Sequence, residues 1–251
     1  MVRSNLYNTL FRKNQSGGKS SALSFFSNIK SGNFMKLLQN KKEFLILVLA
    51  NLIVQLGITY YVMENAHKDA DRKQAKTPPS ILFIVLFFIV SIALISFMMA
   101  DIPIWAKIIS FIIFSVMEGY FLSFMKYFVD QAIIQMAIAG TMGIFSSMFI
   151  FGMLLILFGI KLSNAFGGVL FFALLGLIIT RIVFMFMGDY SQFSKGIAIF
   201  ALGLFSLFII YDTNQIMQRD YMGDFITASL DYYLDIINIF VNLTRVMDNS
   251  D

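Results

Sequence analysis

The chain has 251 residues, of which 58% are hydrophobic and 14% are charged, whereas an ordinary soluble domain carries about 25% charged residues. This composition predicts that most of the chain lies in a lipid bilayer, and the net charge of +4 gives no reason to expect a nucleic-acid partner. The absence of cysteine and the single histidine, His67, exclude disulfides, thiolate chemistry, iron–sulfur clusters and zinc sites.

The first 42 residues form a basic segment, with eight lysines and arginines and no acidic residue. Its start, MVRSNLYNTLFRK, places apolar side chains on one helical face and basic groups on the other, which is typical of a mitochondrial transit peptide. The alternative is a cytosolic arm that touches anionic lipid. We therefore divide the chain into a basic arm or targeting-like segment, 1–42, and a membrane domain, 43–251.

Seven apolar runs follow the arm. The first six are long enough for the roughly 20 residues that cross hydrocarbon. The seventh is semi-polar, so it is either a span buried among the others or a re-entrant segment covered by protein. The sequence therefore predicts an all-α membrane protein. The runs are Phe44–Met63, Ile81–Ala100, Ile104–Phe124, Ala132–Ile160, Ala165–Met187, Phe193–Met217 and Phe225–Val246.

Two polar stripes occupy the last two runs at helical spacing. A carboxylate at bilayer depth costs roughly 2.5–3.5 kcal/mol on insertion scales, so an acid in a membrane helix is a functional hypothesis. Because a short loop joins the two helices, we expect the stripes to face each other, with Asp212 opposite Asp235. One stripe contains Asp212, Gln215 and Arg219. The other contains Asp231, Asp235, Asn238, Asn242 and Arg245.

Two further charges lie inside apolar runs. Glu118, in FSVMEGYFLS, is either a protonated acid bonded to the backbone or a functional group. Arg181, in GLIITRIVFMF, stays charged, so it either reaches an interface or pairs with an acid. Asp101 and Lys107 flank a loop, and we expect both of them in solvent.

The residue inventory does not favour an enzyme. An intramembrane aspartyl protease carries its second acid in a GxGD motif, and the nearest match, YMGDF, has Tyr221 in place of the first glycine. A rhomboid-like serine protease needs a membrane histidine, and no apolar run contains one. No phosphate-binding or dinucleotide-binding fingerprint is present. We therefore expect no catalytic residues and no cofactor.

The stretch IIYDTNQI, followed by YYLDIINIFVNLTRV, closely resembles the C-terminal signature of the Bax inhibitor-1 family. The pair Glu118–Gly119 is similar to the third-helix pattern of that family. The resemblance covers roughly Glu43 to Met247 and implies a seven-transmembrane-helix bundle with six helices around a central seventh. It also implies a pH-sensitive calcium leak across an intracellular membrane, often with regulation of apoptosis. The two pore aspartates of the family correspond to Asp212 and Asp235.

The sequence departs from the family at an interhelical contact, called the latch here. Bacterial members place an arginine near the end of the second helix, where it contacts the aspartate of the sixth. This chain reads ISFMMADIPIWAK there, with Asp101 and no arginine. The latch is therefore lost or replaced by another cation such as Arg181, for which Glu118, Asp212 and Asp235 are the expected partners.

The paired aspartates have a predictable chemistry. Two carboxylates close together at low dielectric share one proton and titrate as a unit. When both are ionised they repel each other or accept a hard divalent cation. Together with Asn238, and with Asp231, Gln215 and Asn242 nearby, they form only a partial calcium shell, which predicts transient passage of the ion.

The rival hypothesis is a structural or accessory subunit of a larger complex. The missing latch and the long basic arm favour it, and other membrane-protein subunits would then contact the arm. The transit-like start favours the mitochondrial inner membrane over the endoplasmic reticulum or Golgi.

Overall fold

The structure is a computed structural model, and it describes residues 19–66, 79–187 and 190–248. The first 18 residues of the basic arm and His67 lie outside this part of the chain. Within it there is no strand, and a 3-10 turn at Phe124–Tyr127 extends one of the helices. The α-helices are α2 (Lys19–Asn65), α3 (Ile81–Met99), α4 (Ile104–Ser123), α5 (Gln131–Leu157), α6 (Asn164–Met187), α7 (Tyr190–Gln218) and α8 (Phe225–Met247).

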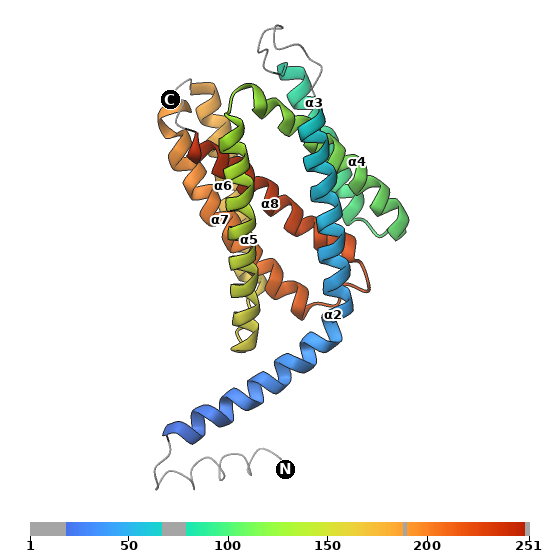
Figure 1. Cartoon of the computed structure of the whole chain (residues 1–251), viewed down its shortest axis with the longest axis vertical. Helices are drawn as coiled ribbons and strands as arrows, with labels where there is room; N and C mark the ends of the chain where they lie inside the picture. Colours follow the sequence, from blue (N-terminus) through green and yellow to red (C-terminus); the bar gives the residue numbers. More distant parts are fainter. Residues whose placement is uncertain (1–18, 67–78, 188–189, 249–251) are drawn as a thin grey trace.

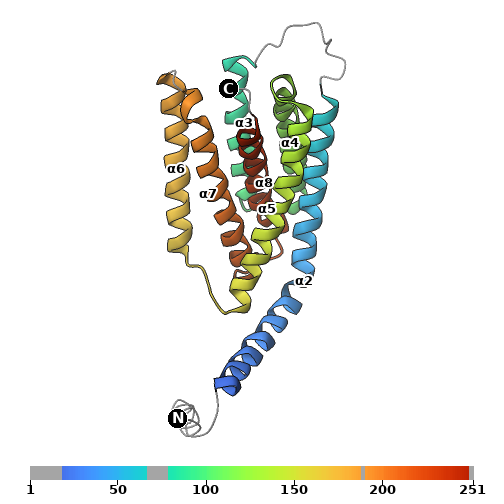
Figure 2. The same cartoon turned by 60° about the vertical axis from the view of Figure 1, so that its left-hand side comes forward.

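The helices form one bundle in which consecutive helices alternate in direction (Figures 1 and 2). The N-terminal part of α2 projects from one end of this bundle, and the loop between α7 and α8 lies at the same end. The helix α8 packs against α2, α5 and α7, and also contacts α3 and α4. The helix α6 packs chiefly against α7.

Six of the helices are long and apolar enough to cross a membrane, and they coincide with the first six predicted runs. The prediction of an all-helical integral membrane protein is therefore confirmed. Most side chains on these helices face outward, which suits a lipid environment; only 11% of the most apolar part of α6 is buried inside the protein. The count of seven spans stays a prediction, because α8 is too polar to qualify by composition alone.

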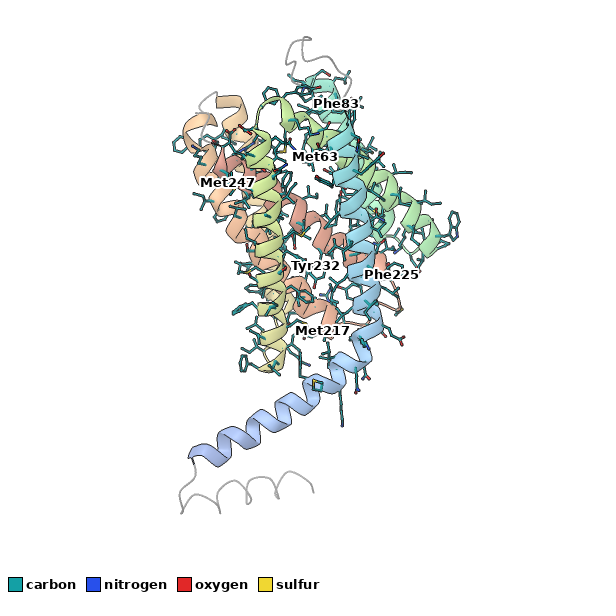
Figure 3. The ribbon with its side chains drawn as sticks, in the orientation of Figure 1. Met63, Phe83, Met217, Phe225, Tyr232 and Met247 are labelled. Carbon is teal, nitrogen blue, oxygen red and sulfur yellow. The ribbon has the colours of Figure 1, made fainter. Side chains whose placement is uncertain are left out.

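The helix α8 differs from the other helices because none of its residues is exposed. Its neighbouring tyrosines point in opposite directions. Tyr232 lies against Phe145 and Phe149 of α5, whereas Tyr233 lies against Phe111 and Phe114 of α4. Figure 3 shows Tyr232 in the interior, with Phe225 and Met247 marking the two ends of α8. Both faces of α8, apolar and polar, are thus covered by other helices.

The hydroxyl groups of both tyrosines also form hydrogen bonds to other helices. Tyr232 donates to Thr213 Oγ1 of α7 at 2.8 Å, and the Tyr233 hydroxyl lies 2.6 Å from Thr59 Oγ1 of α2. A buried hydroxyl without a partner would cost free energy, so these bonds make the large side chains compatible with the interior.

The start of α8 is fixed by an ion pair. Asp224 is the N-cap of α8 and accepts from the Thr227 backbone N–H at 3.1 Å. Lys107 of α4 donates from Nζ to Asp224 Oδ2 at 2.5 Å. Lys107 is only 5% exposed, so the expectation that it lies in solvent is wrong, whereas Asp101 is exposed as expected. Lys107 is buried in the bundle because Asp224, the N-cap of α8, supplies a carboxylate that pairs with its charge.

The approach of α4 to α2 depends on Gly119. A Cβ atom at this position would lie 2.5 Å from the Thr59 carbonyl oxygen and 2.8 Å from Val62 Cβ. Neither atom belongs to the flexible end of a side chain, so the two helices pack closely only because residue 119 has no side chain.

We predict that Gly119→Ala destabilises the fold by roughly 1–3 kcal/mol, because the added methyl group forces the two helices apart. The measurement is the free energy of unfolding of the purified protein in mixed micelles. Gly143→Ala is the matched control, because a Cβ there meets nothing within 4 Å. Equal stability of both variants would contradict the packing argument.

A second prediction concerns the pH dependence of the Lys107–Asp224 pair. Burial opposes ionisation of Asp224, but the hydrogen bonds from Lys107 and Thr227 outweigh it and hold the pKa of this carboxyl below its ordinary value of 3.8. Asp231 of α8 is a further charged group that interacts with it. A lowered pKa in the folded state stabilises the fold above the ordinary value, and this contribution is lost as the pH falls through the lowered pKa.

We therefore expect Asp224→Asn to cost roughly 1.5–3 kcal/mol of stability, the usual range for hydrogen bonds to charged groups. The difference from wild type should be the same at about pH 8 and about pH 5, because Asp224 is ionised at both. Thermal unfolding in detergent at the two pH values is the measurement. A difference that shrinks between pH 8 and pH 5 would show that the carboxylate is not held ionised.

Candidate functional site

The structure brings together the two aspartates that the sequence singled out. The side chains of Asp212 in α7 and Asp235 in α8 lie within hydrogen-bond reach of each other. Asp235 is only 5% exposed, and within the described residues no N–H or hydroxyl group donates to its buried Oδ2 atom. A hydrogen bond between two carboxyl groups requires a proton on one of them. The geometry therefore suits a pair that holds a single proton.

Local structure explains why these side chains meet. Asp212 lies in the last two turns of α7, and the residues after it, Thr213 to Met217, are all buried. A short turn then reverses the chain, so that α8 runs back along α7. Tyr232, one turn before Asp235, bonds Thr213, the residue next to Asp212. This bond sets the register in which the two carboxyl groups are opposite each other.

A third acid accompanies the pair. Asp231 precedes Asp235 by one helical turn and is half-buried. It interacts electrostatically with Asp212, Asp235 and Arg219. The predicted supporting residue Asp231 thus lies beside the pair, on the side of the loop between α7 and α8.

The predicted amide residues have other partners. Gln215 donates from Nε2 to the Leu162 carbonyl oxygen at 2.9 Å, so it ties α7 to the loop before α6. Asn238 and Asn242 donate their side-chain amides to carbonyl groups of α8 itself, at 2.8 and 2.7 Å. These contacts are structural bonds, and a contribution of the amides to an ion shell stays a prediction.

Arg181 and Glu118 lie apart from the acid pair and from each other. Arg181 of α6 donates from Nη2 to Asn242 Oδ1 of α8. Glu118, Asp212 and Asp235 are all described, and none of them forms an ion pair with Arg181. Glu118 of α4 is half-buried and interacts electrostatically with Tyr233, on the opposite side of α8 from Asp212. The latch role of Arg181 therefore remains a prediction without support from its position.

The sequence reasoning missed a polar network between α2, α4 and α8. Thr59 Oγ1 donates to the Gln55 and Ser115 carbonyl oxygens at 3.0 and 3.1 Å, and Ser115 Oγ donates to Gln55 Oε1 at 2.8 Å. Asn51 Nδ2 donates to Ser229 Oγ at 2.6 Å. A signal was present, because residues 51, 55 and 59 are polar, spaced by four and embedded in the first apolar run.

Lys107 was missed for a different reason. A lysine next to a predicted turn is ordinarily solvated, and its partner Asp224 is 117 residues further along the chain. No local pattern predicts such a contact.

No resident metal site is evident in the described part of the chain, where no three His, Cys, Asp or Glu side chains are placed to hold a metal ion. A groove of about 540 Å³ lies elsewhere, between α6 and α7, and its lining includes Leu177, Phe193 and Phe200 but none of the acids. This groove is therefore separate from the acid pair.

Comparison with known proteins gives one family. The family model described as "Inhibitor of apoptosis-promoting Bax1" matches residues 37–251. The chain is 29% identical to Bax inhibitor 1 of Schizosaccharomyces pombe over 167 residues, which covers 66% of this chain and 61% of the yeast protein. The match thus spans less than two thirds of that relative.

Bacterial and plant relatives show the same likeness. An uncharacterised membrane protein of Streptococcus pyogenes serotype M1 is 28% identical over 183 residues, covering 68% of this chain and 73% of the bacterial protein. A BI1-like protein of Arabidopsis thaliana is 33% identical over 87 residues, covering 34% and 33% of the two chains. Since the family model covers both the helical bundle and the acid pair, the chain belongs to the Bax inhibitor-1 family.

Proposed function

We propose that this protein is a proton-gated calcium leak of an intracellular membrane, without enzymatic activity, and that the pair Asp212–Asp235 is its gate. The observation that carries this proposal is that two carboxyl side chains from adjacent helices lie within hydrogen-bond reach of each other inside a bundle of membrane helices. Acidic groups at such depth are costly and are typical of ion or proton pathways.

The gating mechanism follows from the proton count. With one proton, the pair is bridged, and α7 and α8 are held together at this level. When the proton leaves, two negative charges oppose each other at low dielectric, so the helices separate or a cation enters. Calcium suits the second outcome because it prefers carboxylate and carbonyl oxygens, and Asp231 lies one turn away as a further negative charge that attracts a cation.

A leak needs a path across the whole membrane, and α8 provides the polar element of this path. It has 23 residues, which corresponds to roughly 35 Å of helix and is enough to cross hydrocarbon about 30 Å thick. None of its residues is exposed, and it contacts helices on several sides. These properties support α8 as a central seventh span rather than a re-entrant segment.

The location and cellular role rest on the family match and on the basic arm. The description of the family model, "Inhibitor of apoptosis-promoting Bax1", favours a part in apoptosis regulation. The acid-free basic arm favours the mitochondrial inner membrane, where it would act as an uncleaved targeting segment or contact other subunits.

A structural or accessory subunit is the second candidate, and one observation favours it. Arg181, the residue expected to replace the arginine latch of bacterial relatives, bonds Asn242 of α8. In a subunit of this kind, the acid pair would serve only as a buried joint between α7 and α8. Stable co-purification with a large complex, together with no flux in liposomes, would support this alternative.

We predict that Asp235→Asn abolishes the pH dependence of calcium efflux while the protein stays folded. Asparagine keeps the size and hydrogen bonding of aspartate but cannot ionise, so only the switch is lost. The measurement is efflux from liposomes at about pH 6 and about pH 8, an interval over which the proton concentration falls about a hundredfold.

Asp101→Asn is the matched control, because Asp101 is exposed and lies outside the acid pair. Its efflux should keep the wild-type pH dependence. Folded, inserted wild-type protein that shows no efflux at either pH would rule out the leak.

A further inference from the structure

The loop between α7 and α8, residues 219–224, lies directly beside the acids of the proposed gate. Tyr221 is half-buried there, and its ring stacks on Phe44 of α2 with a centroid separation of 5.5 Å. Burial raises the pKa of the Tyr221 hydroxyl, and the neighbouring acids Asp231 and Asp212 raise it further. Tyr221 therefore joins the loop to α2 and lies within electrostatic range of the acids. In Figure 3, Met217 and Phe225 mark the two ends of this loop.

Two lysines from other helices fasten the loop, one at each end. At its start, Lys41 of α2 donates from Nζ to the Arg219 carbonyl oxygen at 2.5 Å. At its end, Lys107 of α4 donates to Asp224 Oδ2 at 2.5 Å. The loop is thus bound by two lysines that lie 178 and 117 residues before their partners in the sequence, and the two bonds lie on either side of Tyr221.

The loop contains a strained turn. Met222 has a φ of 51°, which is unfavourable for a residue with a side chain, and Gly223 follows with a φ of 83°. The Met222 side chain is 93% exposed, and the turn is closed by two local bonds of 2.9 Å, from Met222 N–H to Asp220 Oδ1 and from Asp224 N–H to the Tyr221 carbonyl oxygen. The bonds from Lys41 and Lys107 then attach this turn to α2 and α4.

Capping of α8 does not explain why Lys107 is buried beside Asp224. The cap of α8 is complete without it, because Asp224 accepts from the Thr227 backbone N–H and from Thr227 Oγ1. Burying a lysine is costly unless it is paired, and Lys107 is only 5% exposed. A buried lysine from a different helix is therefore an added restraint on where the loop lies.

We infer that Lys107, with Lys41, is a positioning residue that holds the loop between α7 and α8 closed over the acid pair. The loop is then the cover of the ion path at the α2 end of the bundle, and release of Lys107 from Asp224 is the step that opens it. This inference rests on the proposed leak for its meaning, but the closure itself can be measured without any ion flux.

The test exploits the absence of cysteine, which makes a single introduced cysteine the only thiol in the full-length chain. Ser229→Cys places a thiol of nearly the same size at a fully buried position of α8, just inside the loop. Thr244→Cys places one at an equally buried position near the other end of α8. Met222→Cys, at the exposed tip of the loop, reports maximal labelling. The readout is the rate of modification by a water-soluble maleimide in liposomes.

Each probe is combined with Lys107→Met, with Lys107→Arg, or with Lys126→Met. Arginine keeps the pair with Asp224. Lys126 forms the other described ion pair, with Glu64 at 3.2 Å, and is the matched control. We expect Lys107→Met to speed labelling of the Ser229→Cys probe by roughly tenfold, as when an opening equilibrium loses about 1.4 kcal/mol of closing free energy. Lys107→Arg and Lys126→Met should leave that rate unchanged, and none of the three should affect labelling of the Thr244→Cys probe.

Other labelling results would overturn the inference. Equal acceleration of the Ser229→Cys and Thr244→Cys probes would mean general loosening of the fold rather than opening of the loop. No acceleration of the Ser229→Cys probe would mean that Lys107 does not control the loop.

Calcium efflux then separates the inference from the proposed function. We expect Lys107→Met to raise efflux by roughly tenfold at both about pH 6 and about pH 8, with the pH dependence retained, because the acid pair is intact. Faster labelling without any efflux would keep the closed loop and reject the leak. If the wild type shows efflux and Lys107→Met does not change it, the leak is retained and the loop is not its cover.

Discussion

The structure depends on burying one semi-polar helix inside a bundle of apolar helices. Every polar group on α8 must find a partner within the protein, because lipid offers none. Tyr232 and Tyr233 solve this problem in opposite directions, one with Thr213 of α7 and the other with Thr59 of α2. The acids are the exception, because Asp235 faces the carboxyl group of Asp212 while no described N–H or hydroxyl group donates to its buried Oδ2 atom. The contacts that hold α8 in place are therefore also the contacts that assemble the candidate site.

This arrangement divides the polar interior into two regions. On the α7 side, three acids lie close together, and the loop beside them carries Tyr221 and is fastened by lysines. On the α2 and α4 side, amides and hydroxyl groups from α2, α4 and α8 satisfy one another, and Glu118 lies near Tyr233. The second region fits the role of interhelical adhesion. The first contains the groups that can change charge, and for this reason we place the gate there.

Sequence alone predicted the first six helices well, because long apolar runs in a membrane protein leave few alternatives. The pairing of Asp212 with Asp235 stays a prediction from sequence, based on a short turn and on helical spacing, which determine which side chains face each other. The partners of Lys107 and Arg181 could not be predicted. Asp224 and Asn242 are distant in sequence from them, and nothing in local spacing indicates which of several helices will supply the partner. The close contact between α4 and α2 at Gly119 could not be predicted either, because a glycine in a helix does not indicate which neighbouring helix packs against it.

The central claim is that the Asp212 and Asp235 side chains interact inside the folded protein. A double-mutant cycle on the free energy of unfolding tests it most directly, with Asp212→Asn, Asp235→Asn and the double variant measured in mixed micelles. Direct contact predicts a coupling energy of roughly 0.5–3 kcal/mol, whereas Asp212→Asn combined with Asn242→Ala, two turns further along α8, should be additive within about 0.5 kcal/mol. Additive effects of the two aspartate substitutions would contradict the account.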